Sequence, residues 1–175
     1  MTSQDLLADS ILSSRELLER FLDGFDDGNR TKQAENLPGH VAWILGHCAL
    51  TMHRVAEDCD GRPLPENDFV TGDGRAGGAD RYDTESICFD SSPVGDPARY
   101  PSMARCRAIF EAACERLAST VRSASDEALE KMVPWVAGEI PFAKLVLRIA
   151  FHNGVHAGQI IDLRRGLGLD RVIKV

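Results

Sequence analysis

The stretch PFAKLVLRIAFHNGVHAGQIIDLRR, residues 141–165, carries an apolar stripe that predicts one long amphipathic helix. Its large apolar side chains recur at three- and four-residue spacing, the period of a helix with one face against a core. The stripe consists of Phe142, Val146, Ile149, Ile160, Leu163 and, just beyond, Leu167. Arg164 and Arg165 precede Gly166, which is typical of a helix C-terminus.

Two more helices are predicted in the first third of the chain. The first is predicted from the apolar pattern of residues 4–25, which stops around Gly24 and the DDGN cluster that follows. The second has Asn36 as its capping residue and Pro38 in its first turn, and it runs to about residue 59. Its apolar stripe is Val41, Ile44, Leu45, Cys48, Met52, Val55 and Cys59.

A third long helix is expected from Pro101 to about Ser123. Its inward stripe is Cys106, Phe110, Ala113, Cys114, Leu117 and Val121. Ser125 then caps a short helix that we expect Pro134 to end. The following WVAGEIP, residues 135–141, is expected to form a turn or a short extended piece.

The segment 60–100 links the second and third helices and is dense in Gly, Pro, Asp and Ser. Connections of this length serve as lids, binding loops or crossovers, and a crossover lets the two helices it joins run parallel. Four long helices with no convincing strand predict an all-α fold. We expect a single four-helix-bundle domain over residues 1–175, with the long crossover between helices two and three.

Composition narrows the class of protein. The chain has 175 residues, and its 27 acidic and 20 basic residues give a net charge of -7, which argues against a nucleic-acid partner. No segment approaches the roughly 18 apolar residues of a membrane span, and the N-terminus does not read as a signal peptide. Five cysteines without a CxxC pair suit a reducing compartment. We therefore expect a cytoplasmic protein without a membrane partner, with Cys106 and Cys114 as small buried apolar residues.

The predicted last helix contains two histidines, at positions 152 and 156. At 100° per residue, His156 lies about 40° from the centre of the stripe, His152 about 80° and Gln159 about 100°, all on one side. The two imidazoles are about 6 Å apart along the helix axis, so both can reach one metal ion at about 2.1 Å. The alternative is that each ring is bonded to a backbone carbonyl. A zinc protease is excluded, because Asn153 stands where the HExxH motif needs its glutamate.

A third ligand must come from His40, His47 or His53, which all lie in or near the second helix. Measured from its stripe, His47 and His40 lie about 120° and 100° to one side, and His53 lies about 120° to the other. We therefore expect His53 to face solvent. His47 either leans toward a neighbouring helix or is exposed. His40, about 10 Å further along the helix, either meets a substrate with a pKa lowered by the helix N-terminus or is idle.

Two segments resemble a known family. WILGHCAL, residues 43–50, is similar to the second-helix signature of the DinB/YfiT-like proteins, and HNGVHAGQI, residues 152–160, resembles their last-helix signature, HxxxHxGQI. The order and separation of the two segments match, and the helix pattern covers essentially the whole chain. The name denotes this helical metalloprotein family and not the DNA polymerase.

The resemblance implies an up-down-down-up four-helix bundle, often dimeric, with a divalent ion on three histidines. It points to His47, His152 and His156 as the ligands, to nickel or zinc as the metal, and to a homodimer. Characterised relatives are mostly transferases or isomerases that use bacillithiol, mycothiol or glutathione, and a few are hydrolases. The chain departs from many relatives at Gly154 and in its long 60–100 link. Glycine costs about 1 kcal/mol in a helix interior, so we expect a close helix approach at Gly154.

These observations favour a metal-dependent enzyme acting on a small molecule, more specifically a thiol-dependent S-transferase with a low-molecular-weight thiol as cosubstrate. The alternatives are a metal-dependent hydrolase and a non-catalytic helical module that binds a ligand or metal, or dimerises. Gln159 is expected to orient a histidine or a metal-bound water. Trp43, Trp135 and Phe142 either line a substrate pocket or belong to the core.

Overall fold

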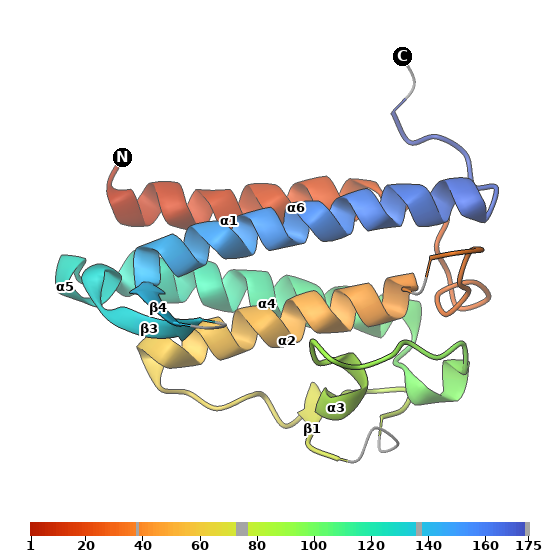
Figure 1. Ribbon diagram of the computed structural model, residues 1–175, viewed down its shortest axis with the longest axis horizontal. Helices are drawn as coiled ribbons and strands as arrows, with labels where there is room; N and C mark the ends of the chain where they lie inside the picture. The colour runs from red at the N-terminus through yellow and green to blue at the C-terminus, as the bar shows by residue number, and fades with distance from the viewer. Residues whose placement is uncertain (38, 73–76, 136–137, 174–175) are drawn as a thin grey trace.

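The computed structural model describes residues 1–37, 39–72, 77–135 and 138–173. The chain is mostly helical, with two small sheets. Its long helices are α1 (Ser3–Arg20), α2 (Val41–Asp60), α4 (Met103–Ser123) and α6 (Phe142–Gly166). Helix α1 contacts α4 and α6, and α2 contacts the same two helices, so the four enclose one core. In Figure 1, α1 and α6 run from left to right, whereas α2 and α4 run from right to left.

The predicted stripes form the core. Cys106, Phe110, Cys114, Leu117 and Val121 of α4 are fully buried, which confirms the inward face predicted for this helix. Cys48 of α2 is also buried, and all five cysteine thiols are free. The helices therefore form where periodic apolar residues give one face to bury.

The ends of the first two helices differ from the prediction. Helix α1 ends at Arg20, and the chain continues in turns to Gly24, whose φ of 77° is left-handed. Helix α2 begins at Val41 with His40 as its N-cap, whereas Asn36 has a φ of 62° and is not the capping residue. Pro38 lies outside the described residues. The cap was missed because histidine is not a typical capping residue.

The fold is mostly helical, as predicted, but it also contains two small sheets that were not predicted. One of their strands lies within residues 135–141, for which a turn or a short extended piece was expected. Strands β1 (Phe69–Val70) and β2 (Tyr82–Asp83) pair in parallel, and β3 (Met132–Trp135) and β4 (Gly138–Pro141) pair antiparallel. The short α5 (Asp126–Glu130), capped by Ser125 as expected, ends before β3 and not at Pro134. Strands of two to four residues are too short to show an alternating pattern in the sequence.

The crossover between α2 and α4 packs against α2. It contains the β1–β2 pair, α3 (Thr84–Ile87) and the 3-10 helix η1 (Pro97–Arg99). Tyr82 is fully buried, and its hydroxyl donates to the Ala42 carbonyl at 2.8 Å. A Cβ at Gly46 would lie 2.6 Å from the Tyr82 ring, so only glycine fits there. The crossover thus covers the face of α2 that carries His47.

The expected close approach of another helix at Gly154 is wrong, because no atom of another described element lies within 4 Å of the place where a Cβ would stand.

In the part of the chain that the structure describes, every helix is too short or too polar to cross a membrane.

Candidate metal centre

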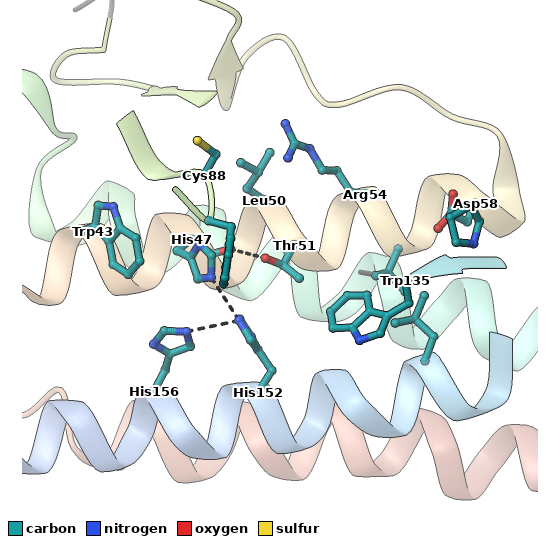
Figure 2. A pocket seen from close by; sticks show the side chains of 14 residues that line it. Trp43, His47, Leu50, Thr51, Arg54, Asp58, Cys88, Trp135, His152 and His156 are labelled. Carbon is teal, nitrogen blue, oxygen red and sulfur yellow. Dashed lines mark hydrogen bonds between the residues drawn. The ribbon is translucent and has the colours of Figure 1, made fainter. Parts of the chain in front are cut away.

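Three imidazoles converge between α2 and α6 (Figure 2). His152 Nε2 lies 3.1 Å from His47 Nε2 and 3.2 Å from His156 Nε2. One ring nitrogen from each histidine lies within 4.8 Å of the other two. The one-turn spacing on α6 places His152 and His156 side by side, and packing of α2 against α6 adds His47.

The crossover fixes the proton on His47. Its Nδ1 lies 2.8 Å from the Ile87 carbonyl oxygen, at the end of α3. Because a carbonyl oxygen only accepts hydrogen bonds, Nδ1 carries the proton and Nε2 presents a lone pair to the other histidines. Ile87 was not predicted as a site residue, since a main-chain carbonyl belongs to every residue type and leaves no signal in the sequence.

Trp43 stacks on the imidazole ring of His47. The two rings are stacked, with centroids 4.7 Å apart and planes inclined by 6°. The Trp43 indole N–H donates to Ser91 Oγ at 2.9 Å, and the Ser91 hydroxyl donates to the Cys88 carbonyl at 2.7 Å. The crossover therefore orients His47 twice, directly through Ile87 and indirectly through Trp43.

Gln159 contacts His156 in the way expected for an orienting residue. Its Oε1 lies 2.7 Å from His156 Nδ1. With the proton on Nδ1 donated to the amide oxygen, His156 Nε2 presents a lone pair toward His152. His152 differs, because its Nδ1 is buried without a hydrogen-bond partner among the described residues. Packing therefore positions the His152 ring.

Burial keeps all three rings neutral. It lowers the pKa of His152 to about 3, where the neighbouring His156 and His47 add to the effect, and it lowers the pKa of His156 to about 4. Burial also lowers the pKa of His47, although the hydrogen bond to Ile87 opposes the change. Neutral imidazole is the form that binds a metal ion, so the cluster needs no deprotonation near pH 7.

The donor set fits a divalent cation. Two ligands at about 2.1 Å from a tetrahedral ion stand about 3.4 Å apart, close to the 3.1 and 3.2 Å separations found here. The lone pairs of His47 and His156 point into the same space, an arrangement that a shared cation stabilises. Three neutral nitrogen ligands leave a fourth position for a water or substrate, as in catalytic sites.

A cavity of about 600 Å³ adjoins the three histidines. Its remaining lining comes from Trp43, Leu50, Thr51, Arg54, Val55 and Asp58 of α2, Cys88 and Phe89 of the crossover, Pro134 and Trp135 of β3, and Leu145 of α6. Both tryptophans thus line the pocket, as one of the two alternatives proposed. Phe142 belongs to the core, where it is almost completely buried. The Asn153 side chain also lies in the core, where it donates to Ser14 Oγ at 3.0 Å.

His40 does not face a substrate. It is completely buried as the N-cap of α2, with Nδ1 accepting from the Trp43 backbone N–H at 3.1 Å and Nε2 donating to the Val94 carbonyl at 3.0 Å. Burial lowers its pKa to about 4. The substrate-facing role considered for His40 is therefore wrong, because the crossover covers this end of the helix.

His53 was expected to face solvent, and that prediction is wrong. Only 2% of its surface is exposed, since α4 and the crossover cover this side of α2. Its Nδ1 accepts from Arg116 Nη1 at 3.1 Å, and its ring packs edge-on against Phe69. Angles measured around one helix cannot show which side a later segment will cover.

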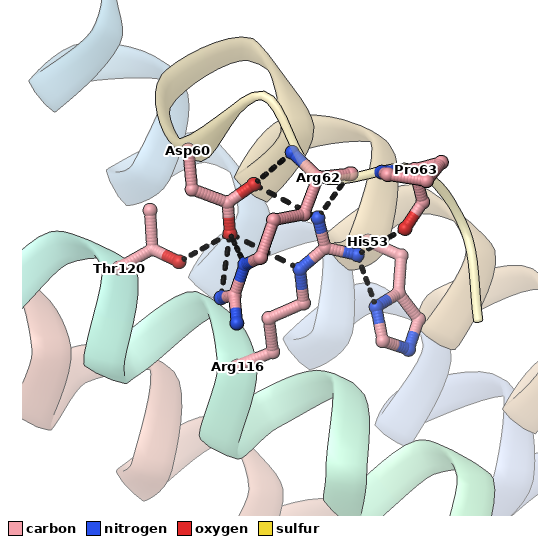
Figure 3. Close-up of polar contacts among 6 residues, drawn as sticks. All are labelled: His53, Asp60, Arg62, Pro63, Arg116 and Thr120. Carbon is pink, nitrogen blue, oxygen red and sulfur yellow. Dashed lines mark hydrogen bonds and ion pairs between the residues drawn. The ribbon is translucent and has the colours of Figure 1, made fainter.

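Arg116 joins His53 to a polar network at the end of α2 (Figure 3). Asp60 accepts from Arg116 Nη2 at 2.9 Å and from Thr120 Oγ1 at 3.0 Å. Arg116 Nη1 also donates to the Pro63 carbonyl at 3.2 Å. The network ties the start of the crossover to α4, which is a structural role.

Comparison with known proteins places this architecture in a family. The DinB superfamily matches residues 11–160, which confirms the resemblance. A conserved protein from Enterococcus faecalis is similar in structure, with a TM-score of 0.66, 14% identity and coverage of 96% of this chain and 99% of that chain. A DinB-like protein from Bacillus cereus is also similar, with a TM-score of 0.60, 16% identity and coverage of 97% and 95%.

At these identities the structural likeness concerns the fold alone. The curated proteins gave no match. The family match spans most of the chain, and therefore this protein belongs to the DinB superfamily.

Proposed function

We propose that this protein is a divalent-metal-dependent enzyme, that His47, His152 and His156 hold the ion, and that the reaction is a thiol-dependent S-transfer. The observation that carries the proposal is the convergence of three neutral imidazoles at one end of a cavity. A purely structural metal site is normally closed by four protein ligands, whereas this one offers three.

The residues of the chain have separable roles in this proposal. A divalent ion held here would lower the pKa of a thiol or water bound to it. Gln159 and the Ile87 carbonyl keep the protons of His156 and His47 on Nδ1, and therefore the Nε2 atoms stay available. Trp43, Leu50 and Trp135 give the cavity apolar walls that bind the carbon frame of a small-molecule electrophile and exclude water.

The metal in this proposal is nickel or zinc, as the resemblance to the DinB/YfiT-like proteins implies. Imidazole nitrogen suits both ions, as it also suits iron and copper. The cosubstrate is a low-molecular-weight thiol, and the cellular compartment is the cytoplasm. Five free cysteines support a reducing compartment, in which such thiols stay reduced.

We also propose that residues 1–175 form one domain with up-down-down-up topology, and that the protein is a homodimer. The mutual contacts of the four long helices and their directions in Figure 1 support the topology. The exposed Leu147, Phe151 and Val155, which follow one another at one-turn spacing on α6, support self-association. Light scattering after size exclusion tests this, with Phe151→Glu expected to shift a dimer toward monomer.

A turnover assay tests the function. Protein purified without a histidine tag is stripped of metal, reloaded with zinc or nickel, and incubated with 1-chloro-2,4-dinitrobenzene and glutathione, bacillithiol or mycothiol. We expect the metal-loaded protein to form the thioether and release chloride faster than the protein-free mixture with at least one thiol, and we expect the metal-free protein and His152→Gln to show only the uncatalysed rate.

Two other outcomes contradict S-transfer in different ways. Metal-dependent ester or amide hydrolysis that needs no thiol identifies a hydrolase. Metal binding without turnover of any substrate identifies a non-catalytic binding module.

A further inference from the structure

We infer that the cavity binds a substrate with an apolar body and an anionic group, and that Arg54 recognises the anion. The inference rests on the proposed function for the identity of the reacting end, but the recognition of the anion is argued from the cavity itself.

The cavity follows one face of α2 away from the histidines. Leu50, Arg54 and Asp58 are three, seven and eleven residues beyond His47, and Figure 2 shows them in this order along the helix. At 1.5 Å per residue, Arg54 stands about 10 Å along the axis from His47. A bound molecule of that length can place one end at the histidines and the other at the guanidinium.

The guanidinium of Arg54 is available for a ligand. Arg54 is exposed and forms no hydrogen bond or ion pair with any residue that the structure describes. Arg116, which lies on α4 and is mostly buried, is by contrast paired with Asp60.

The lining between the two ends selects the rest of the ligand. Leu50, Val55, Trp135 and Leu145 offer apolar surface, which favours an aromatic or aliphatic body. A guanidinium binds carboxylate, phosphate or sulfonate through paired hydrogen bonds. The overall charge of -7 repels anions, so attraction at Arg54 is local to the cavity.

Asp58 limits the position of the anion. It lies one turn beyond Arg54 in the same cavity and forms no ion pair with it among the described residues. A negative group beyond Arg54 would meet this carboxylate. Removing each charge should therefore change anion binding in opposite directions.

Two dyes with nearly the same aromatic frame test the inference: the sulfonate 8-anilinonaphthalene-1-sulfonate and the neutral N-phenyl-1-naphthylamine. Trp43 and Trp135 are the two tryptophans of the chain and both line the cavity, so energy transfer from tryptophan to dye reports binding to the protein. The effect of each substitution at Arg54 then shows whether the dye lies in the cavity. The titrations use metal-free protein, so the result does not depend on metal binding or turnover.

We expect Arg54→Gln to weaken binding of the sulfonate about 5-fold and to leave the neutral dye within 2-fold, as for a partly exposed charge pair. Arg54→Lys should retain part of the preference, and Asp58→Asn should strengthen sulfonate binding about 2- to 3-fold. The inference is overturned if Arg54→Gln changes both dyes equally or neither. Unchanged circular dichroism and thermal unfolding of each variant exclude misfolding as the cause.

Discussion

His47 and His53 lie six residues apart on α2, and both are buried, yet their surroundings differ in the feature that matters for chemistry. The Nε2 of His47 faces two other imidazoles beside a cavity. The Nδ1 of His53 faces a guanidinium, and its Nε2 is buried without a partner among the described residues. Burial alone therefore does not distinguish the two histidines, whereas the convergence of ring nitrogens beside a cavity does, and this convergence supports the proposed metal site.

The two regions also differ in how completely their polar groups are satisfied. Around His53, the Asp60 carboxylate receives hydrogen bonds from Arg116, Arg62 and Thr120, so this network is closed in the sense that both carboxylate oxygens are paired within the protein. Around His47, the donor set is open on the cavity side. A network whose polar groups are paired within the protein rigidifies the fold, whereas ring nitrogens that face a cavity are available to a ligand.

The largest contrast should appear in metal affinity when the two regions receive the same substitution. His152→Gln should lower affinity for zinc or nickel more than about 100-fold, because a ligand is lost. His53→Gln should leave affinity within a factor of 2, since its ring faces α4. Competition titration with a chromophoric chelator measures both. Equal losses in the two variants would show that the comparison is mistaken.

In the closed network, removal of one charge should chiefly affect folding. Asp60→Ala leaves the mostly buried Arg116 without its carboxylate, which should lower the free energy of unfolding by about 3 kcal/mol. Urea unfolding of the metal-free protein measures this change. Metal affinity of the folded variant should stay unchanged. A large drop in that affinity would show that the Asp60 network contributes to metal binding and would contradict the prediction.

The buried histidines of both regions should also make the stability of the protein depend on pH. Burial lowers the pKa values of His40, His53 and His156 to about 4 in the folded protein, against about 6.5 when unfolded. Between these values the unfolded state binds more protons, so stability of the metal-free protein falls as pH decreases from 6.5 toward 4.

The variant His40→Asn isolates one of these groups, because asparagine also caps a helix but does not titrate. It should flatten the dependence of unfolding free energy on pH by about 1 kcal/mol per pH unit within that window. Urea unfolding at several pH values measures the slope. An unchanged slope would contradict the lowered pKa of His40.

A smaller effect on metal affinity than that of His152→Gln concerns the orientation of His156. Gln159→Leu removes the acceptor for His156 Nδ1–H and should weaken metal binding about 10-fold, while Gln159→Glu keeps an acceptor and should retain affinity. The residue is exposed, so the unfolding free energy should change little. Chelator competition again provides the measurement, and equal affinities in both variants would deny the orienting role.

The long helices and part of the site were accessible from the sequence for specific reasons. The α4 stripe from Cys106 to Val121 repeats over several turns, so its period is unambiguous. His152 and His156 share a helix, so their separation follows from helix geometry. His47 lies on a different helix, and the family resemblance was needed to choose it over its neighbours.

Other features depend on contacts that the sequence does not encode locally. Ile87 contributes a carbonyl oxygen, and Ser91 lies in a segment without periodicity, so neither could be predicted to orient His47 or Trp43. Burial of His53 depends on where the crossover and α4 pack. Such contacts join residues about 40 to 60 positions apart and arise only in the assembled fold.

The most direct measurement is an anomalous difference map from crystals of the tag-free protein loaded with zinc or nickel. A single strong peak about 2.1 Å from the Nε2 atoms of His47, His152 and His156 is the predicted result. Absence of a peak there, with the three rings separated and bonded to main-chain carbonyls or water, would contradict the proposed metal centre.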